Sequence, residues 1–240
     1  MSSTFLIMRR ELAGYLRSMS GYVIAALVLL IDGVLFNAFA TPGEKLSSEV
    51  LSQFFLNTSG VVMVASVFIS MRLFAEERQT GTLVLLGSSP VHDWEIVMGK
   101  FLSAVIFLML IMVASVFMPL LIFVNGKISF GHMAAGYIGL LLLGSAAIAI
   151  GTFGSALART QVLAAIFSGC MVVAMIVVWM LAKVTEAPLN DMFTALALHG
   201  RHFPPFMAGA IHLRDVGYYL MVTYVALFSA TRVMEARRWR

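Results

Sequence analysis

The chain has 240 residues, of which 60% are apolar and only 12% are charged, and its mean hydropathy is +0.95. Typical soluble domains carry about 25% charged residues, so this composition excludes a soluble protein and predicts an integral membrane protein. At about 20 residues per span, the length allows about five to seven transmembrane helices. The net charge of +4 does not indicate nucleic-acid binding, because the positive residues lie beside the ends of apolar runs. The single cysteine, Cys170, excludes an intramolecular disulfide.

Residues 2–20 place apolar and charged side chains on opposite sides of a predicted helix. Phe5 and Leu6 belong to the apolar side, and Arg9 and Arg10 to the charged side. This pattern predicts an amphipathic helix at the cytoplasmic surface of the membrane. A plain positive flank of the first span would explain the arginines equally well, and the apolar spacing is what favours a helix.

Six apolar runs follow, each long enough to cross a membrane as a helix. The predicted spans are residues 21–39, 55–73, 101–124, 133–157, 162–181 and 216–233. Pro119, near the end of the third run, predicts a kink or an early stop because proline has no N–H to donate. The predicted fold class is therefore all-α integral membrane, with one transmembrane domain over residues 1–240.

The distribution of Lys and Arg predicts the orientation of these spans. With both termini in the cytoplasm, eleven of the sixteen basic residues fall inside: Arg9, Arg10, Arg17, Arg72, Arg78, Lys100, Arg159, Arg232, Arg237, Arg238 and Arg240. The other five fall outside: Lys45, Lys127, Lys183, Arg201 and Arg214. The excess of positive charge on the cytoplasmic side agrees with the positive-inside rule for six spans.

A charged segment, residues 76–90, separates the second and third spans. Glu76 and Glu77 at its start suit the positive end of a helix dipole, and Gly81 permits a tight bend. The leucines that follow offer an apolar face, and Pro90 stops a helix from continuing. These features predict a short cytoplasmic helix beneath the membrane that presses on a partner. An ordinary solvated loop between the spans is the alternative.

Residues 183–215, between the fifth and sixth spans, are too polar to cross the membrane. They are predicted to form short interfacial or re-entrant helices on the outer side, protected by protein or by lipid headgroups. The histidines His199, His202 and His212 are spaced 3 and 10 residues apart without nearby carboxylates. Ordinary loop histidines are therefore preferred to a metal site.

Asp32 interrupts the first span. An acid within a span is costly and usually faces the bundle interior or a water-filled path. Two interpretations stay open: Asp32 belongs to a pathway or an inter-subunit contact, or it reaches the outer surface. Asn37 lies five residues further on and could share its environment.

Small residues form a stripe along the fourth span. Gly144, Ala147, Gly151 and Ser155 follow one another at spacings of 3, 4 and 4. Such a stripe allows close contact between helices in lipid, so helix packing is preferred to a substrate path.

The sequence supports catalysis poorly. It contains neither a Gly-x-x-x-x-Gly-Lys-Ser/Thr phosphate-binding motif nor a His-Glu-x-x-His metal motif. Asp32 is the only clear intramembrane acid, which leaves an intramembrane enzyme as a remote alternative.

Two parts of the chain carry motifs that are recognisable together. The first part is made of Glu76-Glu77-x-x-x-Gly81-Thr82-Leu83, Ser89-Pro90-Val91 and Trp94-Glu95-Ile96-Val97-x-Gly99-Lys100-Phe101. The second part runs from His202-Phe203 through Gly209 to Leu213-Arg214-Asp215-Val216-x-Tyr218-Tyr219. With the six-span layout, this pattern resembles the type-2 ABC transporter permeases over essentially the whole chain. The closer resemblance is to their gliding-motility (GldF-like) and NosY-like branch.

The resemblance implies a permease subunit in the inner membrane of a bacterium. It implies an N-terminal connecting helix, a coupling helix in the first cytoplasmic loop and outer hairpin helices before the last span. Two permease subunits, identical or related, would pair in the bilayer, and separate ABC ATPase subunits would bind beneath them. The chain would bind no cofactor itself, with ATP and Mg acting through the ATPase. The residues implied in the coupling contact are Glu76, Glu77, Arg78, Gly81, Thr82 and Leu83.

The leading hypothesis is that such a subunit couples ATP hydrolysis to substrate export or to mechanical work, including gliding motility. A helix joined to the second and third spans would convert closure of the ATPase into tilting of those spans. The alternative, within the same fold, is a force-transmitting subunit of a motility or envelope complex that moves no solute.

Overall fold

The computed structural model describes residues 3–40, 46–82, 91–122, 129–186 and 189–238, and its regular elements there are all helices. Six helical stretches in these ranges are long and apolar enough to cross a membrane. The prediction of an all-helical membrane protein with six spans is therefore confirmed. The helices are α1 (Ser3–Arg17), α2 (Met19–Ala40), α3 (Ser47–Ser70), α4 (Arg72–Gln79), α6 (Asp93–Ser115), α7 (Phe117–Leu121), α8 (Phe130–Leu157), α9 (Gln161–Val184), α10 (Leu189–Leu196), α11 (Pro204–Met207) and α12 (Leu213–Arg238).

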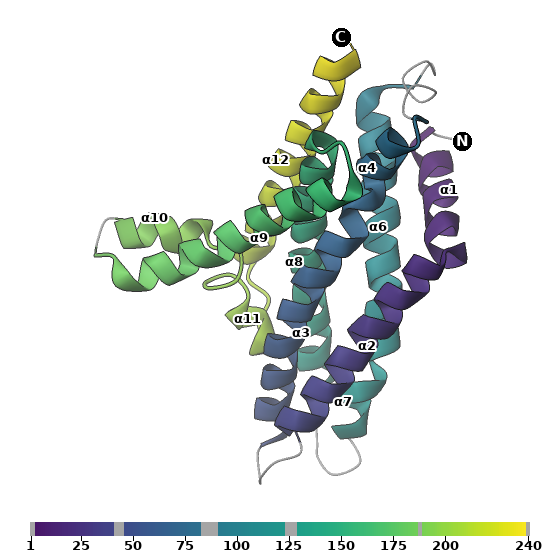
Figure 1. The fold of residues 1–240 in the computed structure, drawn as a ribbon. Coiled ribbons are helices and arrows are strands. Elements are labelled where there is room, and N and C mark those ends of the chain that lie inside the picture. Colours follow the sequence, from purple (N-terminus) through teal and green to yellow (C-terminus); the bar gives the residue numbers. More distant parts are fainter. Residues whose placement is uncertain (1–2, 41–45, 83–90, 123–128, 187–188, 239–240) are drawn as a thin grey trace.

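Helix α8 lies at the centre of the bundle and packs against α3, α6, α9 and α12 (Figure 1). Helices α1, α4 and the end of α12 lie together at one end, which we call the proximal end (Figure 1). The end of α2, the start of α3 and α7 lie at the opposite, distal end (Figure 1). The two ends of the chain are thus on the same side of the bundle, as an even number of spans requires.

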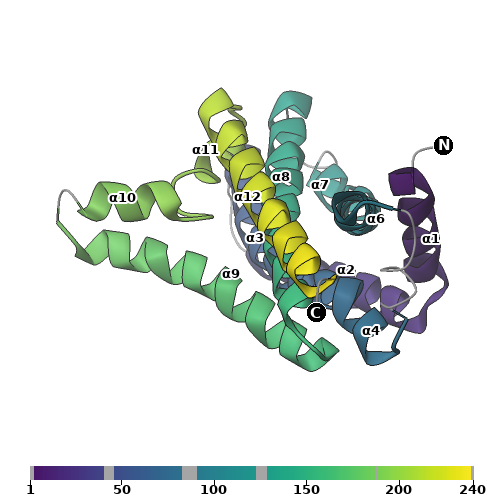
Figure 2. The ribbon, with the colours of Figure 1, turned by 90° about the horizontal axis from the view of Figure 1, so that it is seen from above.

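Helix α9 leaves the bundle at an angle, and α10 folds back along it. Figure 2 shows this pair on one side of the central helices and α1 on the other. Half of the residues of α9 are exposed, including Val162, Ile166, Val173 and Met180. Because these side chains are apolar, their exposed face suits lipid or another membrane subunit.

Several helices are longer than the apolar runs that predict the spans. Helix α3 begins at Ser47 rather than near 55, and α6 begins at Asp93 rather than near 101. Glu95 closes a capping box with His92 at the start of α6. The apolar run marks only the part that crosses the membrane, whereas capping groups extend the helix into polar surroundings.

The third span is interrupted just before Pro119, where a kink or an early stop is predicted. Helix α6 ends at Ser115, and the short helix α7 contains Pro119. Pro119 has no N–H for the Ser115 carbonyl, and at the break the Val116 N–H bonds to the Val113 carbonyl instead.

The stripe of small residues on α8 lies in its contacts with α3 and α6. All four stripe residues, Gly144, Ala147, Gly151 and Ser155, are buried. A Cβ added at Gly144 would lie 2.4 Å from a Leu108 methyl group, and one at Gly151 would lie 1.9 Å from Ser70 Oγ. The helices approach closely because these positions carry no larger side chain.

Candidate functional site

The candidate site lies at the proximal end, where α4 meets α1, α6 and α8. Helix α4 continues the direction of α3 after a break at Met71 (Figure 1). Ser155 of α8 fills that break. Its Oγ accepts hydrogen bonds from the N–H groups of Phe74 and Ala75, both at 3.1 Å, and donates one to the Met71 carbonyl at 3.0 Å. The last stripe residue therefore does more than permit close packing: it satisfies the backbone groups that the break leaves free.

Arg78 fastens the other end of α4 to the end of α8. Its guanidinium donates to the carbonyls of Ala156 and Ala158, the former at 3.2 Å. The Ala156 carbonyl belongs to the last turn of α8, and Ala158 is the residue that caps this end, where a helix dipole favours a cation. Ser155 and Arg78 thus fix α4 to the proximal end of α8 at both ends of the short helix.

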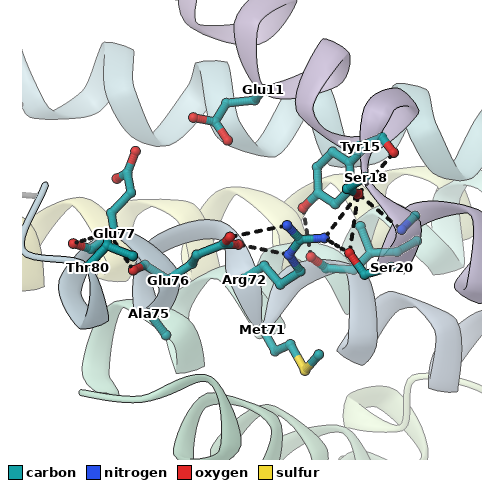
Figure 3. Close-up of polar contacts among 12 residues, drawn as sticks. Glu11, Tyr15, Ser18, Ser20, Met71, Arg72, Ala75, Glu76, Glu77 and Thr80 are labelled. Carbon is teal, nitrogen blue, oxygen red and sulfur yellow. Dashed lines mark hydrogen bonds and ion pairs between the residues drawn. The ribbon is translucent and has the colours of Figure 1, made fainter.

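Arg72, at the start of α4, joins it to the turn between α1 and α2. Arg72 Nε lies 2.8 Å from Glu76 Oε2, and the same guanidinium donates to Ser18 and Ser20 (Figure 3). Beside it, the Tyr15 hydroxyl donates to the Ile69 carbonyl at 2.8 Å. Burial raises the pKa of Tyr15, so the hydroxyl keeps its proton and remains a donor.

A buried lysine joins α6 to both α1 and α4. The Lys100 side chain is 1% exposed, and its Nζ lies 2.9 Å from Glu77 Oε1 and 3.0 Å from Glu11 Oε1. Arg10, which is 71% exposed, approaches the same two carboxylates at 3.7 and 3.9 Å. Gly99 lets α1 come this close, since a Cβ there would lie 2.9 Å from Ile7. We call Arg10, Glu11, Glu77 and Lys100 the proximal ion network.

The proximal ion network borders a cleft of about 400 Å³ between α1, α4 and α6. The charged residues that line it are three cations and three anions: Arg10, Arg72, Lys100, Glu11, Glu76 and Glu77. These charges balance, so the cleft does not by itself select an anionic or a cationic ligand. The ion pairs that border the cleft hold α1, α4 and α6 together through directional bonds.

The two glutamates do not lie where their sequence position predicts. Glu76 and Glu77 were expected to open a helix, but they lie in the last turn of α4, which ends at Gln79. That expectation was wrong, because Arg72 and Lys100, rather than a helix dipole, neutralise them. Figure 3 shows the Glu77 side chain directed from α4 towards Glu11 of α1.

The exposed part of the candidate site is the turn after α4. Gln79, Thr80, Gly81 and Thr82 are all exposed. Gly81 has φ +76°, which explains why a glycine follows the helix here. The Thr80 hydroxyl donates to the Glu76 carbonyl at 3.0 Å and ties the turn to α4. Leu83 and the rest of the predicted segment through Pro90 lie outside the described residues.

The distal half of the molecule holds the other predicted polar residues. Asp32 is buried in the bundle rather than reaching the surface. His199 Nε2 lies 2.8 Å from Ser59 Oγ, and the Ser59 hydroxyl also donates to the Leu56 carbonyl at 2.6 Å. Burial lowers the pKa of His199, so its ring is neutral and donates from Nε2.

The expectation that the loop histidines lack carboxylate partners is wrong for His202. Its Nδ1 lies 2.7 Å from Asp215 Oδ1, and its Nε2 lies 3.2 Å from the Ala195 carbonyl. Both ring nitrogens therefore lie within hydrogen-bond distance of an oxygen. The pair joins the segment after α10 to the first turn of α12. The fold, not the local sequence, brings the two residues together.

The six helices that are long and apolar enough to cross a membrane, with the proximal ion network at one end, define a multi-pass membrane protein. The profile of the ABC-2 family transporter protein family matches residues 6–229. Since that match covers most of the chain, the protein belongs to the ABC-2 transporter family. No curated protein gives a significant match to the sequence.

Proposed function

We propose that the protein is the permease subunit of a bacterial ABC transporter and couples ATP hydrolysis by separate ATPase subunits to substrate export or mechanical work. Family membership supports the permease role. The observation that carries the coupling role is that α4 is bonded to α1, α6 and α8 and ends in an exposed turn. A partner pressing on that turn would move three helices together, which is the kind of rigid contact that coupling needs.

The proposed orientation places the proximal end in the cytoplasm of the bacterial cell, below the inner membrane. Described basic residues gather at that end, in α1, α4, the start of α6 and the end of α12. Cytoplasmic loops of membrane proteins carry such an excess of Lys and Arg. In this orientation both termini and the turn after α4 face the compartment that contains ATP.

The six residues implied in coupling divide into two groups in this proposal. Gly81 and Thr82, together with Leu83, would meet the ATPase, because the described members of this group are exposed. Glu77 and Arg78 would transmit the force, because their side chains bond to α6 and to the end of α8. Glu76 would do so through Arg72, which it pairs with inside α4 and which bonds to Ser18 and Ser20. The first group sets whether the partner binds, and the second sets whether its movement reaches the spans.

The proposal includes a second permease subunit, identical or related, and membership of the GldF-like and NosY-like branch. The exposed apolar faces of α2 and α9 support pairing within the bilayer. The chain itself would bind no nucleotide, and ATP and Mg would act on the ATPase subunits. The motifs around Gly81 and Asp215 support the branch assignment.

The test is to purify the tagged chain from the cells that naturally produce it and identify copurified proteins by mass spectrometry. We expect a protein with a phosphate-binding ATPase motif and nucleotide hydrolysis in the purified complex. Thr82→Arg should lower the amount of copurified ATPase without changing the melting temperature of the permease. Glu186→Arg, at an exposed position beyond α9, is the matched control. Absence of any ATPase, or reaction of a Thr82→Cys thiol with reagents outside the cell, would contradict the proposal.

A further inference from the structure

Asp32 lies deep inside the bundle. It is 2% exposed and stands thirteen residues after the start of α2 and eight residues before its end. At about 1.5 Å per residue, these separations are about 20 Å and about 12 Å along the helix. The carboxyl therefore lies within the apolar part of the span, whichever end of the bundle faces the cytoplasm.

Neutral hydroxyl groups lie near Asp32. The Thr58 hydroxyl of α3 is close enough to stabilise a charge on the carboxyl group, and Tyr137 of α8 is close enough to interact with it electrostatically. The Tyr137 hydroxyl lies 3.2 Å from Ser115 Oγ, at the end of α6. Among the residues that the structure describes, none makes a hydrogen bond to Asp32 Oδ1. Within the described ranges, no Lys, Arg or His forms an ion pair with Asp32.

An ionised carboxylate in these surroundings would lack both water and a counter-ion. Burial of an unpaired charge is so unfavourable that a carboxyl group takes up a proton instead. Intramembrane acids of this kind commonly mark proton or ion pathways. Glu77 differs from Asp32 in having a counter-ion. Within the described residues each carboxyl group has one oxygen without a hydrogen bond, but Glu77 Oε1 lies 2.9 Å from Lys100 Nζ.

We propose that Asp32 is a proton-binding site, filled in this packed conformation and emptied when α2 separates from α3 and α6. On separation the carboxyl O–H bond breaks, the proton passes to entering water, and the carboxylate that remains is hydrated. Repacking reverses the step. Because the packed state holds one more proton than the separated state, their ratio falls by up to about tenfold for each unit of rising pH. This proposal concerns the isolated chain and does not depend on the ATPase.

The protonation state is tested by infrared spectroscopy of the full chain in phosphatidylcholine nanodiscs. We expect a protonated-carboxyl C=O band at pH values well above about 3.9, the pKa of free aspartate. The band should disappear in Asp32→Asn and persist in Asp191→Asn, a control at an exposed position of α10. Thr58→Val removes a nearby hydroxyl that stabilises the ionised carboxylate and should keep the band to higher pH.

The same experiment contains the results that would overturn the proposal. If the wild-type and Asp32→Asn spectra show the same C=O bands at every pH above about 5, Asp32 is ionised and the proposal is wrong. A carboxylate band that shifts with sodium concentration would assign a metal-cation site instead and would also overturn it. Where Asp32→Asn fails to fold, ¹³C-labelled aspartate in the unmodified chain identifies the same band by its isotope shift.

Discussion

Replacing Lys100 by Met should destabilise the protein strongly, because it removes the central cation of the proximal ion network. The methionine fits the volume, but Glu77 is 8% exposed and would stay near the membrane without the ammonium that lies 2.9 Å away. Removing one partner of a buried ion pair costs about 3–5 kcal/mol. For a chain of this size, 1 kcal/mol changes the melting temperature by about 2–4 °C, so a decrease of roughly 6–20 °C is expected.

The matched control is Arg10→Met, because Arg10 faces the same two carboxylates from solvent. Exposed ion pairs contribute about 0–1 kcal/mol, so this variant should lose no more than about 4 °C. The melting temperature of each purified variant is measured in one detergent by the loss of the monodisperse peak on heating. Equal losses in Lys100→Met and Arg10→Met would refute the claim that the network is buried and held by Lys100.

Three further predictions concern other contacts and use the same thermal assay. Ser155→Ala removes the hydrogen bonds at the break between α3 and α4 and should cost about 1–3 kcal/mol, whereas Ser145→Ala, which loses only a bond to its own helix, should cost less. Gly151→Ala places a Cβ 1.9 Å from a side-chain oxygen of α3 and should cost about 1–3 kcal/mol, while Gly169→Ala, with open space around it, should be neutral or stabilising. Burial lowers the pKa of His199, so as the pH falls the unfolded chain takes up a proton before the folded chain does. The melting temperature should therefore fall as the pH drops below about 6.5. An equal fall in His199→Gln would show that another group causes the pH dependence.

The spans could be predicted because each depends on a local property of the chain. A run of about 20 apolar residues has few stable arrangements in lipid other than a helix, so the runs located all six spans. The interruption before Pro119 was also local, since it follows from the missing N–H of one residue. By contrast, the departure of α9 from the bundle leaves no trace in its sequence, because its apolar run resembles those of the other spans.

The contacts of the candidate site could not be predicted because their partners are far apart in the chain. Lys100 and Glu11 are separated by 89 residues, and Ser155 lies 81 residues from Phe74. The break at Met71 has no local glycine or proline to mark it. One signal was available: Lys100 enters an apolar run, and a lysine there needs a carboxylate partner. Nothing in the sequence singles out Glu11 and Glu77 among the acidic residues as its partners.

The role of the proximal ion network is better explained as fixing the position of α4 than as raising the stability of the protein. A buried ion pair replaced by apolar residues of similar volume often leaves stability unchanged or improved, and apolar contacts near lipid are weakly directional. The double variant Lys100→Met/Glu77→Met should therefore recover most of the melting temperature lost in Lys100→Met, while Glu11 stays partly exposed beside Arg10. In the purified complex with its ATPase, the same double variant should nevertheless hydrolyse ATP with weaker dependence on the permease, because α4 is no longer fixed to α6. Full recovery of both stability and coupling would show that apolar packing alone positions α4 and that the ions have no positioning role.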